Sequence, residues 1–449
     1  MGDVAMSKQI VIRKTVVTGM CTAALAGLLA GCGNQSESPK PDAPKPVQVE
    51  PVELVFYALS PLTGSDAEKA AQWTSYVQKK YPHISFKFIN AEGDNSVDKI
   101  TMANQPIDIL FGSFAGFMLY KDRDLVTDMS ALVKQMNFDL AAIEKPYIDL
   151  VQRSYDNKLP LLPVYDLRLG LYYNKDLFDK FGIAYPKDGV TWEELLTTAK
   201  QLTRTDGGVA YRGLTTAAAG GGLAINQYSL GYMNAQATDK AALYTDSWKR
   251  FFETIVPLFT VPGYAPTPEL MAGGAQLKMF EQGTAAMLLA FNSYGTFNLP
   301  SVPINWDVAT LPEVGGLRGI GAQPYPVYLG LSSTSKHREA AVQAISALLS
   351  SETQIDRSSK YGVFSPLKDP KAKAAIGEAA MWKGKHVQAF TAQTPAAPAP
   401  AVRAEFKTIA EGELNKAFLS VVNGEKDTNT ALREAEEAAN KAIQQVLSR

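Results

Sequence analysis

A short run of aromatic and charged residues near position 166 has the strongest potential for ligand chemistry in this sequence. Tyr165, Asp166 and Arg168 lie within four consecutive positions. An aromatic ring can stack on an apolar C–H face, and carboxylate and guanidinium groups can each pair with two neighbouring hydroxyls. The run therefore suits a polyhydroxylated ligand such as a sugar. An equally acceptable interpretation is an internal Asp166–Arg168 pair that only shapes the backbone.

Motifs for catalysis, metal binding and nucleotide binding are missing from the sequence. The three histidines, His83, His337 and His386, show no metal-ligand spacing. There is no G-x-S-x-G, and the glycines at 220–222 lack the lysine of a phosphate-binding loop. We expect no catalytic residue, no metal and no cofactor. A surface-anchored carbohydrate-active enzyme, which would need two carboxylates facing each other across a cleft, remains the alternative.

Charge and length exclude further classes. The 44 basic and 45 acidic residues nearly balance, and no Lys/Arg cluster predicts a nucleic-acid partner. Beyond the N-terminus no apolar stretch is long enough to span a membrane. A chain of 449 residues suggests two domains or one large one. We expect a monomer.

The N-terminus has the features of an export signal. Lys8, Arg13 and Lys14 precede an apolar stretch over 16–30, which predicts a signal peptide at 1–31. The stretch ends in Leu-Ala-Gly followed by Cys32 and resembles a bacterial lipobox. That resemblance implies lipidation (palmitate) at Cys32 and a location on the extracellular face of the cell membrane. The alternative is an ordinary secretory signal followed by a coincidental cysteine.

Residues 32–51 predict a flexible tether. Prolines at 39, 41, 44 and 46 favour an extended backbone, and large apolar side chains are rare. At about 3.1 Å per residue, the segment would reach roughly 60 Å. It would hold a folded body away from a membrane, although a terminus without a role has the same composition.

Strand and helix patterns alternate after the tether. The predicted order is strand, helix, strand, helix and strand over 52–60, 66–81, 84–89, 95–104 and 107–111. This alternation is typical of an α/β fold. Ligands of such sheets bind beyond the carboxyl ends of the strands, which places 60–63 and 112–116 at the rim. Phe114 is therefore a candidate contact.

A longer segment carries a family resemblance. Residues 168–173 predict a strand, 177–181 a short helix, and Thr191 with Glu194 a capping box that opens the next helix. The segment, which reads LYYNKDLFDKFGI followed by YPKDG and TWEELLTTAKQLT, resembles the signature of bacterial extracellular solute-binding proteins of ABC importers. The F-x-x-G-x-A-A-M pattern at 280–287, the segment 332–336 and the C-terminal helix after Asp427 resemble the same family.

The resemblance implies a two-lobe α/β fold, in which each lobe has a mainly parallel sheet flanked by helices and strands cross between the lobes. The implied first lobe contains 52–165 and 291–331, and the second contains 166–290 and 332–449. It also implies a carbohydrate ligand, with an oligosaccharide expected, and ABC permease subunits as partners. A sugar-sensing lipoprotein is a further alternative.

The resemblance also implies positions for ligand contacts. Tyr165, Asp166 and Arg168 would lie at the first crossing, and relatives place contacts near Asn292 and Tyr294. Tyr325 and Tyr328 flank the return crossing, where we expect one to face the cleft and the other to pack. The complete candidate set is Phe114, Tyr165, Asp166, Arg168, Tyr228, Asn292, Tyr294, Tyr325 and Trp382. For Tyr228 and Trp382 the alternative role is core packing.

Overall fold

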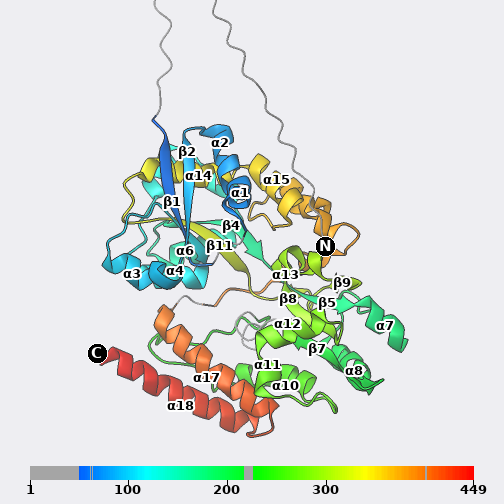
Figure 1. The fold of residues 1–449 in the computed structure, drawn as a ribbon. Helices are drawn as coiled ribbons and strands as arrows, with labels where there is room; N and C mark the ends of the chain where they lie inside the picture. The colour runs from blue at the N-terminus through cyan, green and yellow to red at the C-terminus, as the bar shows by residue number, and fades with distance from the viewer. Residues whose placement is uncertain (1–49, 61, 63, 217–225, 400–401, 449) are drawn as a thin grey trace, which may run out of the picture. The chain divides into compact units, whose positions relative to one another are not determined.

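Two five-stranded β-sheets organise the residues that the computed structural model describes, which are 50–60, 62, 64–216, 226–399 and 402–448 (Figure 1). The strand order is β2-β1-β3-β11-β4 in the first sheet and β6-β7-β8-β5-β9 in the second. We call each sheet with its helices a lobe. The predicted signal peptide, Cys32, most of the tether and the glycines at 220–222 lie outside the described residues.

The first sheet is mixed in strand direction. Strand β1 (Val52–Ala58) is parallel to β2 (Ile84–Asn90) and β3 (Ile109–Ser113), whereas β11 (Tyr325–Leu331) is antiparallel to β3 and β4 (Leu161–Leu167). Its strands are rich in β-branched and aromatic residues, and the central ones are almost wholly buried, as expected for a sheet covered on both faces.

Helices of the first lobe come from two distant parts of the chain. They are α1 (Asp66–Lys69), α2 (Ser75–Lys80), α3 (Val97–Met102), α4 (Phe114–Lys121), α5 (Ser130–Gln135), α6 (Lys145–Ser154), α14 (Arg338–Leu348) and α15 (Ser351–Tyr361). The helix predicted over 66–81 begins at a capping box of Ser65 and Glu68 and contains a π-helical turn at Ala70–Thr74. Short 3₁₀ turns lie at Gly93–Asn95 and Leu140–Ala142.

The second sheet is also mixed. It contains β5 (Leu169–Asn174), β6 (Arg204–Asp206), β7 (Val209–Thr216), β8 (Ala285–Phe291) and β9 (Trp306–Ala309). Strands β7 and β8 are parallel, and the other three pairings are antiparallel. A separate parallel pair joins β10 (Ile320–Gly321) to β12 (Thr394–Pro395).

The helices of the second lobe cover both faces of its sheet. They are α7 (Lys175–Phe181), α8 (Trp192–Leu202), α10 (Asp246–Phe259), α11 (Pro268–Met271), α12 (Gly273–Glu281), α13 (Asn292–Phe297), α17 (Ala404–Val422) and α18 (Thr428–Leu447). The short helix α16 (Pro370–Ala374) packs instead on α15 of the first lobe. Short 3₁₀ turns lie at Leu299–Ser301, Ala375–Glu378, Ala380–Trp382 and Val387–Phe390. Helices α17 and α18 lie side by side and share the core of α10 (Figure 1).

The two-lobe α/β class predicted from the sequence is confirmed, with two differences in detail. Both sheets are mixed rather than mainly parallel, because crossing strands β4, β11 and β5 run against their neighbours. The lobe bounds also differ from those expected: β9 pairs with β5 of the second sheet, and α14 packs its apolar face on the first. Among the described residues, no helix combines the length and apolarity needed to cross a membrane.

Candidate ligand-binding site

The predicted run at 165–168 forms the connection between the two sheets. Strand β4 ends at Leu167 and β5 begins at Leu169, so Arg168 alone joins them. Arg168 Nε donates a hydrogen bond to Asp166 Oδ2 at 2.9 Å, and the Tyr147 hydroxyl donates to the same oxygen at 2.7 Å. The internal Asp166–Arg168 pair is therefore formed.

Burial and charge act on this group together. Asp166 is fully buried, and the Arg168 side chain is 19% exposed. Burial raises the pKa of Tyr147 well above its usual value, and the Asp166 carboxylate raises it further. Burial alone would lower the pKa of Arg168, but the adjacent Asp166 carboxylate outweighs this effect and the pKa is raised. The Arg168 guanidinium therefore stays charged across the physiological range.

Asn292 lies beside this connection, at the start of α13. Its Oδ1 accepts a hydrogen bond from the Arg168 N–H at 2.8 Å, and its own N–H donates to the Arg168 carbonyl at 2.9 Å. The residue is 1% exposed. Its side-chain carbonyl oxygen therefore serves the backbone of the crossing strand.

Tyr294 and Trp382 lie in a compact aromatic core on one face of the second sheet. The Tyr294 ring contacts Tyr172 edge-on at 5.7 Å between centroids, and its hydroxyl donates to Glu281 at 3.2 Å. Trp382 is fully buried, and its indole N–H donates to Thr296 at 3.2 Å. This position favours the core-packing alternative for Trp382.

The remaining candidates are half-buried. Tyr165 packs on Phe111 with ring centroids 6.2 Å apart, and burial raises its pKa to about 12. Tyr325 packs on Phe291 at 5.2 Å. Tyr228 contacts Phe251 edge-on at 5.9 Å and lines a cavity of about 550 Å³ within the second lobe.

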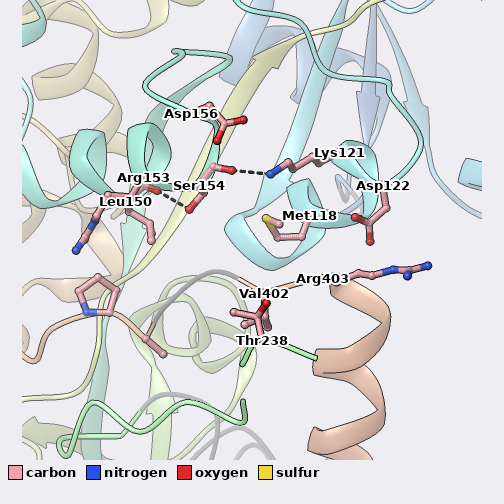
Figure 2. A pocket seen from close by; sticks show the side chains of 12 residues that line it. Met118, Lys121, Asp122, Leu150, Arg153, Ser154, Asp156, Thr238, Val402 and Arg403 are labelled. Atoms are coloured by element: carbon pink, nitrogen blue, oxygen red, sulfur yellow. Dashed lines mark hydrogen bonds between the residues drawn. The ribbon is translucent and has the colours of Figure 1, made fainter. Parts of the chain in front are cut away.

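A cavity of about 620 Å³ lies between segments of the two lobes (Figure 2). The first lobe contributes residues of α4 and α6 and the turn after α6. The second lobe contributes Thr238 and the segment that leads into α17. The lining residues are Met118, Lys121, Asp122, Leu150, Arg153, Ser154, Asp156, Thr238, Pro398, Ala399, Val402 and Arg403.

The charged groups of this cavity are partly fixed by the protein. Lys121 Nζ donates to the Ser154 carbonyl at 2.6 Å, as Figure 2 shows. Asp122 Oδ2 accepts a hydrogen bond at 3.3 Å from the N–H of Ala404, the first residue of α17. This bond places a carboxylate of one lobe at the positive end of a helix of the other.

A smaller cavity of about 110 Å³ shares Met118, Ala399 and Val402 with the larger one. Phe114, predicted from its place after β3, lines it, and so does Tyr232. Burial raises the pKa of Tyr232 well above its usual value, and the Glu411 carboxylate adds to the shift. Tyr232 stacks on Trp248 with ring planes 17° apart.

The two cavities together offer apolar surface, hydroxyl and carbonyl groups, and charges of both signs. Such a lining can hold a polar organic ligand by packing and hydrogen bonding. Among the described residues, no group of His, Cys, Asp and Glu could hold a metal ion.

Sequence reasoning missed every residue that lines the larger cavity. Lys121 and Arg153 lie near the C-terminal ends of α4 and α6, and Thr238 follows a loop with no motif. The rule that ligands bind beyond strand ends located the N-terminus of α4 at Phe114. It gave no signal for the far ends of α4 and α6 or for the segment before α17.

Comparisons with known proteins agree with this architecture. Residues 62–355 match the family described as bacterial extracellular solute-binding protein. An ABC substrate-binding protein from Listeria monocytogenes, solved in complex with cycloalternan, is 19% identical, has a TM-score of 0.71, and is covered over 100% of its length by 88% of this chain.

Two further solved structures have the same fold. A cyclic alpha-maltosyl-1,6-maltose binding protein from Arthrobacter globiformis is 17% identical, with a TM-score of 0.69 and coverage of 88% of this chain and 100% of that one. A sugar transporter protein from Rhizobium etli in an open conformation is 22% identical, with a TM-score of 0.67 and coverage of 86% and 99%. Because the family match spans more than half of the sequence, this chain belongs to the bacterial extracellular solute-binding proteins.

Proposed function

We propose that the protein is an extracellular, lipid-anchored binding protein that captures a carbohydrate between its lobes and delivers it to the permease subunits of an ABC importer. The observation that carries the proposal is the cavity of about 620 Å³, which residues of both lobes line. Solved proteins of the same fold include complexes with cycloalternan and with mannobiose. The sequence around Cys32 supports the lipid anchor.

Ligand capture follows because residues of both lobes line the same cavity. A ligand that touches α4 and α6 on one side and Thr238 and Val402 on the other gains its full contacts only when the lobes are close. Ligand binding therefore shifts the population toward the closed arrangement. The closed form is the species that we propose the permease recognises.

The lining favours an oligosaccharide over a single small ion. Met118, Leu150 and Val402 supply apolar surface for C–H faces, and Ser154 and Thr238 supply hydroxyls. We keep Phe114 as a ligand contact in this proposal, because it lines the adjoining cavity. Asn292, Tyr294 and Trp382 lie in protein contacts, and we assign them to the scaffold.

The competing enzyme hypothesis requires two carboxylates on opposite sides of the bound sugar. Among the described residues that line the larger cavity, the carboxylates are Asp122 and Asp156, and both belong to the first lobe. Asp122 also accepts the hydrogen bond from α17. This distribution favours binding over hydrolysis.

Thermal melting of the purified protein against mono- and oligosaccharides, neutral and uronic, tests the proposal. A ligand at a hundredfold its dissociation constant adds about 2.7 kcal/mol to the free energy of unfolding and raises the melting temperature. A sugar that raises it and is recovered intact supports binding, whereas a cleaved sugar supports the enzyme. No shift across the panel contradicts the carbohydrate assignment.

A further inference from the structure

Arg168 is bonded to both lobes at once. Its backbone N–H and carbonyl pair with Asn292 of the second lobe, at 2.8 and 2.9 Å. Its side chain turns back toward the first lobe, where Nε donates to Asp166 Oδ2 at 2.9 Å. Any change in the backbone at the connection between β4 and β5 therefore moves this guanidinium relative to Asp166.

The first lobe holds the Asp166 carboxylate in place. Asp166 belongs to β4, where it pairs with Pro326 of β11, and its carboxylate accepts a hydrogen bond from the Tyr147 hydroxyl at 2.7 Å. Its N–H donates to the carbonyl of Phe364, a residue of the aromatic core on the second sheet, at 2.9 Å. The Tyr147 carbonyl accepts in turn from the hydroxyl of Tyr328 on β11, at 3.2 Å. Asp166 is 0% exposed, so water cannot replace a lost partner.

The guanidinium also contacts the segments that return between the lobes. It lies over the Phe364 ring at 5.7 Å, and Nη1 donates to the Phe390 carbonyl at 3.5 Å. The guanidinium thus contacts β4 and two later segments of the chain, at Phe364 and Phe390. A change of lobe angle alters these contacts together.

We infer that Asp166 and Arg168 form a positioning pair that sets the population of the lobe arrangement able to bind ligand, without touching the ligand. Lobe closure concentrates dihedral changes in a few connecting residues. Arg168 Nε forms the ion pair with Asp166 Oδ2 at 2.9 Å, and no other ion pair to this carboxylate is formed within the described part of the chain, where Oδ1 also has no hydrogen-bond partner. A buried carboxylate separated from its cation is costly. The pair therefore favours lobe angles at which it stays formed.

The effect of the pair on ligand affinity rests on the proposed binding function, whereas its effect on the lobe arrangement does not. When only a fraction of the protein is in the binding arrangement, the apparent dissociation constant rises by the inverse of that fraction. A substitution in the pair therefore raises the apparent dissociation constant of every ligand by the same factor. A residue that contacts ligand instead changes different ligands by different factors.

The test measures lobe separation without ligand, by pulsed electron resonance between two spin labels. Cysteines replace Met102 of the first lobe and Tyr244 of the second, which are 86% and 40% exposed, with Cys21→Ser and Cys32→Ser. Arg168→Met removes the charge and keeps a similar length. Arg433→Met is the matched control, because Arg433 is exposed and its ion pairs within the described ranges are with Glu434 and Glu437, its neighbours on α18.

We expect the control to reproduce the parent distance distribution and Arg168→Met to broaden or displace it. The double variant Asp166→Asn with Arg168→Met leaves no buried charge uncompensated, and it serves if the single variant does not fold. It too should displace the distribution. Unchanged distances in a folded single or double variant would overturn the inference.

Affinity for maltotriose and mannobiose provides the second measurement. If the pair acts only by positioning, Arg168→Met should lower the affinity for both sugars by the same factor, of roughly 5–150-fold. Loss of one sugar with retention of the other would make Arg168 a ligand contact and refute a pure positioning role. If neither sugar binds the parent protein, only the proposed function is contradicted, and the distance measurement still decides the inference.

Discussion

Arg168 and Asn292 bond to each other twice although 124 positions separate them, with the Arg168 N–H donating to Asn292 Oδ1 at 2.8 Å and the Asn292 N–H to the Arg168 carbonyl at 2.9 Å. In the first bond, the Asn292 side-chain oxygen accepts from the backbone as a strand carbonyl would, and so extends the β5–β8 pairing by one hydrogen bond beyond Phe291, where that pairing ends. It fixes where the crossing strand enters the second sheet.

Replacing Asn292 tests that bond. Asn292→Ala leaves the Arg168 N–H without its acceptor, and we expect the free energy of unfolding to fall by about 1–3 kcal/mol. Denaturant unfolding measures the change. Asn298→Ala, at an exposed position after the same helix, is the control and should change stability by less than about 0.5 kcal/mol. Equal effects of the two variants would contradict the assigned role.

Tyr294 is expected to act through packing. Its ring contacts Tyr172 and Phe280, so Tyr294→Ala should lower stability by about 3–5 kcal/mol. Tyr294→Phe removes only the hydrogen bond to Glu281 and should cost about 1 kcal/mol. Sugar affinity of Tyr294→Phe, measured by calorimetry, should equal that of the parent. A several-fold loss of affinity at unchanged stability would restore Tyr294 as a ligand contact.

Two glycines should respond in opposite directions to substitution by alanine. At Gly213 of β7, a Cβ would collide with the backbone of Ala199 in α8, so we expect a loss of at least about 1–3 kcal/mol. At Gly412, inside α17, a Cβ would meet no atom within 4 Å. Gly412→Ala should stabilise the protein by about 0.5–1 kcal/mol because alanine favours the helix. Thermal melting checks both directions: the melting temperature should fall for Gly213→Ala and rise for Gly412→Ala.

Alkaline pH should destabilise the folded chain. Burial raises the pKa of Tyr57, Tyr165 and Tyr173 to about 12, whereas an unfolded tyrosine titrates near about 10. The folded state thus holds these protons more tightly, and its advantage is complete below about pH 10 and is lost as pH rises toward 12. Near-ultraviolet tyrosinate absorbance should rise together with unfolding. Tyr165→Phe should lose less stability over this window than the parent; an equal loss would exclude Tyr165 as a source.

The cavity between the lobes can be filled without disturbing a core. Thr238 is exposed and lines the cavity, so Thr238→Trp should obstruct it with little change in stability. We expect sugar affinity, measured by calorimetry, to fall at least about tenfold, equivalent to 1.4 kcal/mol. Thr408→Trp, at an exposed position of α17 outside this lining, is the matched control. Equal affinity of the two variants would place the ligand elsewhere.

Local rules predicted many element boundaries correctly. The capping box of Thr191 and Glu194 opens α8, and Asp427 caps α18, as the sequence indicated. These signals are reliable because each depends on side chains within four positions of the backbone they bond. The family resemblance supplied the two-lobe arrangement.

Pairing between distant segments was harder to predict. The apolar face of α14 has a clear helical spacing, but that spacing does not say which sheet it covers, and the helix packs on the first. Strand β9 was likewise assigned to the wrong side, although it pairs with β5. The larger cavity combines side chains from four separate segments, so no single stretch of sequence reveals it.

The chain order of the sheet strands has a consequence for folding. The first sheet is incomplete until β11 has been synthesised, up to residue 331. The core of the second lobe is incomplete until α17 and α18, which come later in the chain, have also been synthesised. Contacts between such distant segments close large loops, which slows folding relative to locally connected folds. Neither lobe can be cut out as one continuous piece of chain. During synthesis, therefore, both lobes must wait for segments that emerge late from the ribosome.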